Sequence, residues 1–431
     1  MTKKDIIVVG AGAGGLMAAG RAAELGADVL LIEHMSAVGR KLAITGKGRC
    51  NLTNVAEQAE FLKHFYPNGR FLRTAFSGFF SDHIINFFEA KGVKTVIERG
   101  GRVFPQSGNA GDVVNALEQW VKKSGVTIRL NTAVEQVITE QDTVKGVLIS
   151  AVERRKNKLV KIGKQEEIQC NSLILVTGGA SYPATGSTGE GYRIAKKLGH
   201  TVITPRPALV PLETAGRRTE ALDGLQLKNV TASTWVNGKR SALEFGEMSF
   251  TPFGVTGPII LTLSHEVVDQ LSNGNQVELQ IDLKPALDHK TLDDRLIREF
   301  QQSGKKQFKS ILKNLLPRQL IQFCLEDLNI EPDITGNEIQ AGERKRIRNW
   351  LKAVPFSISG YRPFSEAIIT SGGVSVKEVN PKTMESRLVR QLFFAGEVLD
   401  IQADTGGYNL QAAFSTGWLA AESAVKSLST D

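Results

Sequence analysis

The sequence predicts an α/β fold in which a parallel-sheet domain is interrupted by two inserted parts. Three observations predict it. An apolar run at residues 6–9 leads into a glycine-rich turn and then into a helical stretch of small residues. Similar strand-and-glycine pieces return at 173–179 and at 392–407. The residues between these later pieces, 206–354, lack such a pattern and form first short strands with turns and then helices.

Length and composition set broad limits. A chain of 431 residues is too long for one hydrophobic core, and its 41% hydrophobic and 23% charged residues are ordinary for a globular protein. No apolar run is long enough to cross a bilayer, so we expect no membrane partner. The three cysteines lie far apart without metal-like spacing, so we expect a cytoplasmic protein with no metal site. The net charge of +8 is mild, and nucleic acid is not expected as a partner.

The first structural unit is "DIIVVGAGAGGLMAAGRAAELGADVLLIEH", residues 5–34. It predicts a buried strand at 6–9, a helix at about 14–25 and a second strand at 28–32. Gly10 permits a tight turn, Gly12 lets a pyrophosphate approach the backbone, and Gly15 lets helix and strand pack closely. Glu33, 18 residues beyond Gly15, is placed to accept hydrogen bonds from a ribose. The order predicts a Rossmann-like dinucleotide site formed by Gly10, Ala11, Gly12, Ala13, Gly14, Gly15, Glu33 and His34.

The next segment, "GRKLAITGKGRCNLTN" at 39–54, decides which dinucleotide is expected. It is too rich in glycine for a good helix, whereas an NAD site usually continues into another crossover helix. FAD lies extended, so a loop that follows it needs backbone donors and cations along its length. We therefore expect FAD, with contacts from Gly39, Arg40, Lys41, Thr45, Gly46, Gly48, Arg49, Cys50 and Asn51. Cys50 has no partner cysteine nearby, so a redox disulfide is not expected.

Two later segments return to the same domain. The strand at 173–176 ends in Thr177, Gly178 and Gly179, where the backbone can pass close to a cofactor, and a helix is expected at about 192–198. The strand at 392–395 is followed by a Gly396–Glu397 turn and by Gly406–Gly407 at the start of a closing helix. The N-terminus of that helix carries a partial positive charge that suits an electron-rich group.

These segments resemble a bacterial family of NAD(P)/FAD-dependent oxidoreductases with the glutathione-reductase-type FAD fold. Within it, "TGGASYPATGSTGEGY" and "FAGEVLDIQADTGGYNLQAAFSTG" are similar to aminoacetone oxidase-like and 3-dehydro-bile-acid reductase-like flavoproteins. The resemblance implies that the backbone of Val134 meets the adenine and that Glu397 and Asp400 lie near the ribityl chain and pyrophosphate. It also implies cofactor contacts at Gly372, Gly373, Gly396, Gly407, Tyr408, Asn409 and Leu410.

The inserted parts divide the chain into further subdomains. We expect the FAD-binding domain at 1–205 and 355–431, a β-rich, barrel-like subdomain at 206–284 and a helical subdomain at 285–354. "VNGK" at 236–239 predicts a two-residue hairpin turn. The resemblance likewise implies an inserted β-domain with a helical cap.

The sequence identifies no catalytic acid or base. Tyr361, Arg362 and Glu366 are candidates for substrate handling, with a salt-bridged strand connection as the alternative. A second GxGxxG motif is lacking, so NADH or NADPH is a candidate transient donor that docks at the flavin, and oxygen is the other electron partner considered. We expect an FAD-dependent oxidoreductase that oxidises an amine or reduces an activated C=C bond of a small substrate. The alternatives are an RNA-modifying or RNA-binding flavoprotein, supported by "GERKRIRNWLK" at 342–352, and a flavin sensor without turnover. The oligomeric state is not predicted.

Overall fold

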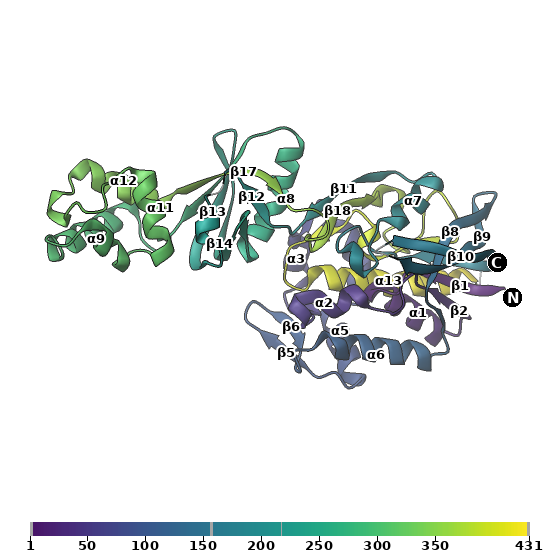
Figure 1. The fold of residues 1–431 in the computed structure, drawn as a ribbon. Helices are drawn as coiled ribbons and strands as arrows, with labels where there is room; N and C mark the ends of the chain where they lie inside the picture. The colour runs from purple at the N-terminus through teal and green to yellow at the C-terminus, as the bar shows by residue number, and fades with distance from the viewer. Residues whose placement is uncertain (1–2, 156–157, 217, 429–431) are drawn as a thin grey trace. The chain divides into compact units, whose positions relative to one another are not determined.

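The computed structural model describes residues 3–155, 158–216 and 218–428, and the α/β fold predicted from the sequence is confirmed. The chain forms two compact units (Figure 1). Unit 1 contains Met1–Pro207 and Phe364–Asp431, and unit 2 contains Ala208–Pro363.

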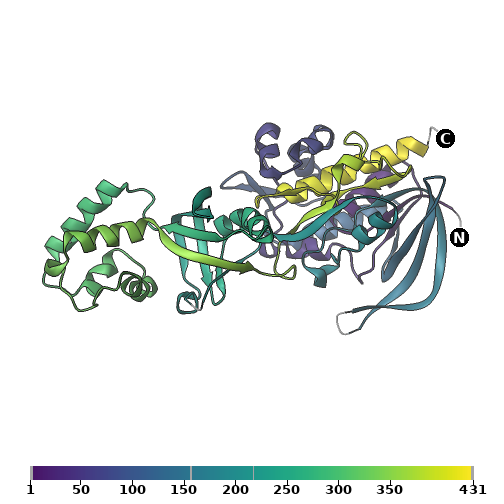
Figure 2. The same ribbon diagram turned by 90° about the horizontal axis from the view of Figure 1, so that it is seen from above.

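The main sheet of unit 1 is a mixed sheet in the order β7-β2-β1-β10-β9-β8, with β19 also paired to β10. Its parallel part consists of β1 (Lys4–Val9), β2 (Val29–Ile32), β7 (Thr127–Arg129), the end of β10 (Lys158–Leu175) and β19 (Leu392–Phe394). Its antiparallel part adds β8 (Thr132–Glu140) and β9 (Thr143–Arg155). Strand β9 pairs with β8 on one side and with residues 158–169 of β10 on the other. Figure 2 shows β9 and β10 as a long hairpin that leaves the sheet.

Successive residues of β1 face two different cores, as expected for a strand buried on both sides. Ile6 and Val8 belong to the core that contains α1 (Ala13–Glu24), α6 (Ala110–Lys123) and α13 (Tyr408–Leu428). Ile7 and Val9 belong to the core that contains β8, β9 and α7 (Glu190–Lys197). The strand, turn and helix predicted at the N-terminus are therefore confirmed.

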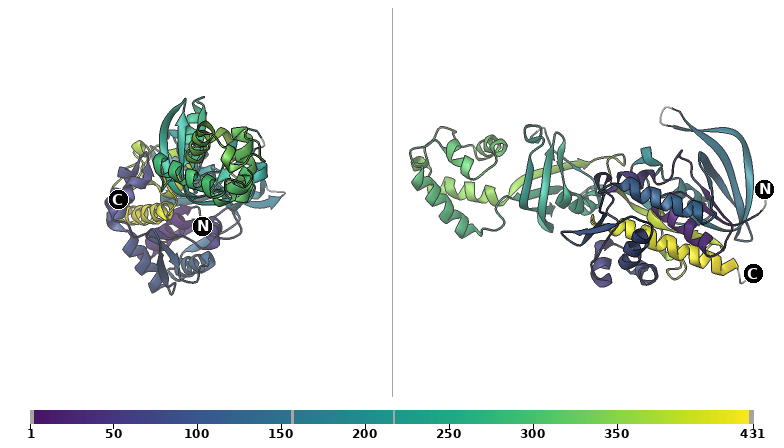
Figure 3. Two further views of the ribbon diagram at one scale, coloured as in Figure 1. Left: turned by 90° about the vertical axis from the view of Figure 1, so that its left-hand side faces the viewer. Right: turned by 90° about the horizontal axis from the view of Figure 1, so that it is seen from below.

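Helix α13 packs directly against α1 through glycine (Figure 3). A Cβ atom added at Gly417 would lie 2.4 Å from the carbonyl oxygen of Gly14, so the two backbones approach too closely for a side chain. The last helix of the chain thus completes the packing of the first helix.

The remaining elements of unit 1 are short. Three small sheets, β3-β6-β5, β20-β4 and β11-β18, accompany the helices. These short helices and strands are α2 (Arg40–Gly48), β3 (Thr53–Asn54), α3 (Gln58–Phe61), β4 (Phe65–Tyr66), α4 (Arg73–Gly78), α5 (Ser81–Ala90), β5 (Thr95–Glu98), β6 (Arg102–Pro105), β11 (Val202–Ala208), β18 (Ile369–Val374) and β20 (Gln402–Ala403).

The expectation that 39–54 contains no helix was wrong in part, because α2 occupies its first half. Gly39 begins the helix in a left-handed conformation (φ 63°), and Arg40–Ile44 contains good helix formers. The helix is interrupted at Thr45 (ψ 146°), and Gly46 and Lys47 adopt positive φ. The glycines therefore shorten the helix rather than prevent it.

Unit 2 contains a closed barrel, in the strand order β12-β15-β14-β13-β16-β17. The turn between β13 and β14 has positive φ at Asn237 (47°) and Gly238 (79°), so the hairpin predicted from "VNGK" is confirmed. The barrel strands are β12 (Leu212–Thr214), β13 (Gln226–Val236), β14 (Lys239–Thr251), β15 (Gly254–Thr256), β16 (Val277–Asp282) and β17 (Val354–Tyr361).

Two features of unit 2 differ from the expectation. Residues 258–272, which we placed in a strand-rich stretch, form helix α8 (Pro258–Ser272), with proline in its first turn where the missing N–H costs nothing. Strand β17 belongs to the barrel, so the chain returns to unit 1 at Phe364 rather than at 355.

The helices of unit 2 share one core with the barrel. Besides α8 they are α9 (His289–Gln302), α10 (Phe308–Ile311), α11 (Arg318–Leu328) and α12 (Ala341–Lys352), and these four confirm the expected helical stretch. Phe323 of α11 stacks on Phe356 of β17 with ring centroids 5.4 Å apart. The barrel and the helices therefore form one compact unit rather than two separate ones. Within the ranges that the structure describes, no helix is long and apolar enough to cross a membrane.

Candidate functional site

The glycine turn after β1 leaves space at one position and none at the other two. A Cβ atom at Gly10 would lie 2.6 Å from the Val176 carbonyl oxygen, and one at Gly15 would lie 1.8 Å from that of Gly10. At Gly12, by contrast, no described atom lies within 4 Å of the Cβ position. Gly12 also begins α1 without a side-chain cap from the described residues, so the first N–H groups of the helix remain available for an anion.

The carboxylate of Glu33 is held at the end of β2. Its Oε2 accepts a hydrogen bond from the backbone N–H of Ala11 at 2.7 Å, and its Oε1 accepts one from that of Met35 at 2.9 Å. His34 Nδ1 lies 3.2 Å from Glu190 Oε2. Burial lowers the pKa of His34, but the hydrogen bond to Glu190 and the charges of Glu33 and Glu190 outweigh it, so this pKa lies above its ordinary value.

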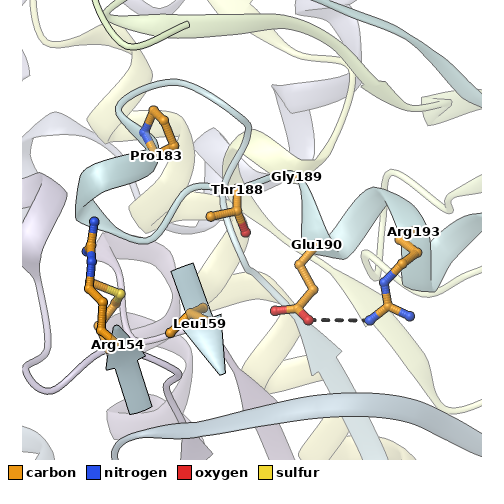
Figure 4. A pocket seen from close by; sticks show the side chains of 8 residues that line it. Arg154, Leu159, Pro183, Thr188, Gly189, Glu190 and Arg193 are labelled. Atoms are coloured by element: carbon orange, nitrogen blue, oxygen red, sulfur yellow. Dashed lines mark hydrogen bonds and ion pairs between the residues drawn. The ribbon is translucent and has the colours of Figure 1, made fainter. Parts of the chain in front are cut away.

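A cavity of about 620 Å³ adjoins this end of β2 (Figure 4). Met35, next to His34, forms part of its wall, and Arg193, which also lines it, is ion-paired to Glu190 at 3.3 Å. The cavity is lined by Met35, Arg154, Leu159, Pro183, Thr188, Gly189, Glu190 and Arg193. Because Glu33 is predicted to bind the ribose, we expect the adenosine half of a dinucleotide to lie beside this cavity. Val134, 2% exposed, precedes a shift in the β8–β9 register, consistent with a role through its backbone.

Three buried polar atoms lie among the predicted site residues without a partner in the described part of the chain. They are Arg40 Nε, Asn51 Oδ1 and Thr177 Oγ1. Buried polar groups are normally hydrogen-bonded, so these atoms call for a polar ligand. A guanidinium donor suits a phosphate, whereas an amide oxygen suits an N–H group, and FAD carries both. The residues present therefore fit FAD.

A polar network connects Lys41 to the strand ends. Lys41 Nζ lies 2.7 Å from Glu397 Oε2 and donates to Ser181 Oγ at 2.6 Å. Glu397 Oε1 accepts hydrogen bonds from the backbone N–H of Thr370 at 2.8 Å and from Ser181 Oγ at 3.1 Å. The family resemblance had implied that the segment Thr370–Val374 passes near the flavin ring, although no role was predicted for the Thr370 side chain. Ser181, a polar residue beside the glycine pair in "GGAS", was not predicted.

Glycines bring distant segments together around this network. A Cβ atom at Gly179 would lie 2.4 Å from Thr370 Oγ1, one at Gly373 would lie 2.7 Å from the Val398 carbonyl oxygen, and one at Gly407 would lie 2.4 Å from that of Thr53. The further glycines predicted in the site, Gly178, Gly372 and Gly396, all have positive φ. All of the predicted cofactor-binding residues thus belong to unit 1, and these glycines bring several of their segments into contact.

Several predicted side chains are occupied by contacts within unit 1. Arg49 is ion-paired to Glu98 and lies 4.3 Å over the Phe104 ring, and Thr45 Oγ1 donates to the Leu42 carbonyl oxygen. Asn409 bonds both backbone groups of Ala403. Asp400 Oδ2 accepts from Asn68 Nδ2 at 3.0 Å, while Tyr408 and Leu410 pack in the cores. Any cofactor contact from Tyr408, Asn409 or Leu410 is therefore expected through the backbone at the start of α13.

Cys50 is fully buried, and burial raises the pKa of its thiol to about 12, so it is not a reactive thiolate.

The three candidates for substrate handling fall in different units. Arg362 Nη1 lies 2.8 Å from Glu213 Oε1, and its guanidinium lies over Phe253, so it forms the salt-bridged strand connection considered as the alternative. Tyr361 ends β17 in unit 2, and Glu366 lies in unit 1. Their substrate role stays a prediction.

A histidine–aspartate pair, missed from the sequence, lies beside the start of α13. His64 Nδ1 is 3.0 Å from Asp404 Oδ2, and the His64 ring stacks on Tyr408 with centroids 4.1 Å apart. The backbone N–H of Asp404 also donates to the His64 carbonyl oxygen at 3.1 Å. No sequence signal connects the two residues, because they meet only through the pairing of β4 with β20.

Comparison with known proteins identifies the family. The family model described as the HI0933-like protein Rossmann domain matches residues 4–423. This chain belongs to the HI0933-like Rossmann-domain family. It is an FAD-dependent oxidoreductase, as the sequence predicted.

Two relatives match over nearly their whole length. The ribosomal RNA dihydrouridine synthase of Haemophilus influenzae is 31% identical over 420 residues, covering 96% of this chain and 97% of the relative. The 3-dehydro-bile acid delta(4,6)-reductase of Clostridium scindens is 29% identical over 421 residues, covering 97% and 98%. The structure of 3-ketosteroid delta1-dehydrogenase from Sterolibacterium denitrificans aligns with a TM-score of 0.51 and 14% identity, covering 99% and 100% of the chains, which shows a shared fold.

Proposed function

We propose that this HI0933-like protein reduces a C=C bond conjugated to a carbonyl, with a uridine of ribosomal RNA as its substrate. The assembled, incompletely partnered polar lining of unit 1 supports a flavin at the centre of the reaction. The relatives named for dihydrouridine synthesis and for bile acid reduction supply the shared chemistry, since both names denote saturation of a ring double bond.

We assign different roles in this reduction to different residues of the chain. Bound FAD, once reduced by the nicotinamide, would supply a hydride to a polarised double bond and return to its oxidised form. Lys41 and Glu397 hold the strand ends in place, and the start of α13 offers positive potential to an electron-rich group. His64, oriented by Asp404, holds the proton that the carbon next to the carbonyl must receive. The substrate thus gains one hydride and one proton.

The electrons are proposed to come from NADH or NADPH. The sequence has one GxGxxG motif, at Gly10–Gly15, which supports direct docking of the nicotinamide at the flavin rather than a second nucleotide domain. The buried Cys50 thiol supports the same route, because no accessible dithiol relays electrons from this loop.

The support for RNA does not come from the segment that the sequence suggested. In α12, Arg344 and Arg348 are ion-paired to Asp293, and Lys352 is ion-paired to Asp282. Three of the five cations of that helix are thus paired within unit 2, while Lys345 and Arg346 are exposed. The net charge of +8 and the cations of unit 1 are the better support, together with the full-length similarity to an RNA-acting relative.

A second candidate substrate is a small cyclic enone, favoured by the similarity to the bile acid reductase. Amine oxidation with oxygen is the other branch of the sequence-based prediction. Both are decided by the same measurement.

The experiment is an anaerobic titration of the holoprotein with NADPH or NADH while the flavin absorbance is followed. Bleaching, then recovery on adding ribosomal RNA that lacks dihydrouridine, with two hydrogens gained by the RNA, is the expected result. Recovery with a small enone but not with RNA would support the second candidate. Bleaching by an amine alone, with recovery only in air, would overturn the proposal.

A further inference from the structure

A two-stranded hairpin, β5 and β6, stands at the edge of unit 1 (Figure 1). Strand β5 is the outer strand of the β3-β6-β5 sheet. Its neighbouring residues Val96 and Ile97 point to opposite faces, and both are exposed, at 39% and 57%. Their cross-strand partners on β6, Phe104 and Val103, are buried, so the exposure is confined to the outer strand. An edge strand with exposed β-branched aliphatic side chains on both faces is unusual in a monomer.

Cations surround these aliphatic residues. Lys47 at the end of α2 and Arg99 and Arg102 at the hairpin tip are exposed. The acid on the tip, Glu98, is already paired to Arg49, and the hydrogen bond from Arg49 lowers the pKa of Glu98, so this acid stays ionised. We call this set (Ile44, Lys47, Arg49, Val55, Val96, Ile97, Arg99 and Arg102) the hairpin face.

The hairpin face is continuous with the segment that follows α2. The backbone N–H of Val55 donates to the Gly101 carbonyl oxygen at 2.9 Å, and Asn54 Nδ2 donates to that of Gly100 at 2.9 Å. Asn54 lies three residues beyond Asn51, whose buried Oδ1 has no partner in the described ranges. The surface therefore begins where the predicted flavin loop ends.

Two guanidinium groups of the hairpin face are held by one ring. Arg49 lies 4.3 Å and Arg102 lies 5.8 Å from the centroid of Phe104. Arg102 Nε also donates to the Arg99 carbonyl oxygen at 3.1 Å. A guanidinium held in this way is ordered before a ligand arrives. The group free for phosphate or for stacking on a base is that of Arg102, because Arg49 is already paired to Glu98.

We propose that the hairpin face binds an unpaired segment of RNA next to the nucleotide that is reduced. Lysine and arginine side chains match the phosphates, and the aliphatic side chains and guanidinium planes match the faces of unstacked bases. Unpaired RNA is specified because a flavin can reach the face of a uracil only when the base is unstacked. This inference rests on the proposed function and adds to it the surface that holds the substrate.

The test uses the holoprotein with Arg99→Gln and Arg102→Gln together, two exposed tip residues outside the flavin lining. The control is Lys196→Gln with Lys197→Gln on α7, which removes the same charge from exposed positions elsewhere in unit 1. Affinity for a single-stranded ribosomal RNA fragment is measured between about 50 and 200 mM salt. We expect about tenfold weaker binding and a salt slope smaller by about 1.4, since a single strand releases about 0.7 counterion per neutralised phosphate.

FAD content and bleaching by the nicotinamide are expected to be unchanged in both variants. Equal losses in the tip and control variants, or equal losses for RNA and polyglutamate, would indicate a general anion or acidic-protein surface and overturn the inference. If wild type reduces RNA and the tip variant binds and reduces RNA equally well, the surface assignment fails while the proposed function stands. If the tip variant alone loses RNA affinity but wild type reduces only small enones, the surface stands and the proposed substrate fails.

Discussion

Two cation-rich segments look alike in the sequence and differ in the structure. The segment at 39–54 and helix α12 both carry several lysines and arginines, and each contains glycine. In α12 three of the cations are paired to Asp293 and Asp282 inside unit 2. In 39–54 Arg40 has no ion pair with a described residue and its buried Nε has no partner there, while Lys41 is ion-paired to Glu397. The Nε of Arg348 in α12 is also buried without a described partner, but Nη1 of the same side chain lies 3.6 Å from Asp293 Oδ1.

The difference teaches that the partners of a cation, rather than the number of cations, indicate a ligand site. Three of the five α12 cations are paired to acids of their own unit, and in 39–54 Lys41 and Arg49 are paired in the same way to Glu397 and Glu98. The 39–54 cations lie beside further unpartnered polar atoms and beside a glycine turn with open space at Gly12. Four predictions test the proposed site in unit 1, and two of them compare it directly with α12.

The largest effect is expected for glycine. Gly15→Ala would place a Cβ atom 1.8 Å from the Gly10 carbonyl oxygen, so we expect loss of bound FAD and about 3 kcal/mol of destabilisation. Gly342→Ala in α12 meets no described atom within 4 Å, and we expect a gain of about 0.5–1 kcal/mol. Flavin absorbance and urea unfolding measure both. A Gly15→Ala protein that keeps FAD would contradict the assignment of the turn.

The next largest effect is expected from substituting His64, the proposed proton donor. His64→Asn is expected to slow reoxidation of reduced flavin by the C=C substrate by about 10²–10⁴-fold, because the proton donor is lost. Reduction by nicotinamide and reoxidation by oxygen should not change, and stopped-flow absorbance separates these steps. His289→Asn, on the first residue of α9 in unit 2, is the control and should react like wild type. Equal slowing of the oxygen reaction would show that His64 acts on the flavin site in general.

A smaller effect is expected from substituting Arg40 in the 39–54 segment, compared with Arg344 in α12. Arg40→Met is expected to weaken FAD binding by about 10- to 100-fold, the cost of one hydrogen bond from a charged donor. Arg344→Met, which breaks an ion pair with Asp293, should leave FAD affinity unchanged and cost less than about 1 kcal/mol of stability. Calorimetric titration of the apoprotein with FAD compares the two. Similar affinities would remove Arg40 from the cofactor site.

The smallest effect concerns pH. The pKa of His34 is raised above 6.5, so its contact with Glu190 stabilises fully below that pH and is lost as pH rises through the raised value. Glu190 has a lowered pKa despite its burial, so its contribution appears above 4.5. The unfolding free energy should therefore fall from about pH 6 to about pH 9 by more in wild type than in His34→Gln. Parallel curves for the two proteins would exclude this contact as the cause.

Part of this structure was predictable because it depends on local rules. The turn at Gly10–Gly15 and the hairpin at Asn237–Gly238 need positive φ or a missing side chain, and both requirements show in the sequence. Helix α8 was not predicted, because a short apolar run such as "PIILTLS" has the same composition in a strand and in a buried helix.

The candidate site was predictable only where its residues follow a motif. Glu33 and the glycines do so. Ser181 and Thr370 meet Glu397 across long separations in the chain, and His64 meets Asp404 in the same way. Such pairs are set by the topology, which a single sequence states only indirectly.

The contact between Gly14 and Gly417 has a consequence for synthesis of the protein. Helix α1 cannot pack against α13 until almost the whole chain has been synthesised, because the insert of unit 2 is translated before Phe364–Asp431. At about 5–20 residues per second, the ribosome needs roughly 8 to 30 seconds to pass through that insert. During this interval the apolar face of α1 that α13 finally covers is exposed. We expect nascent-chain chaperones to bind it first. Moving residues 364–431 ahead of the insert by circular permutation would shorten this vulnerable period.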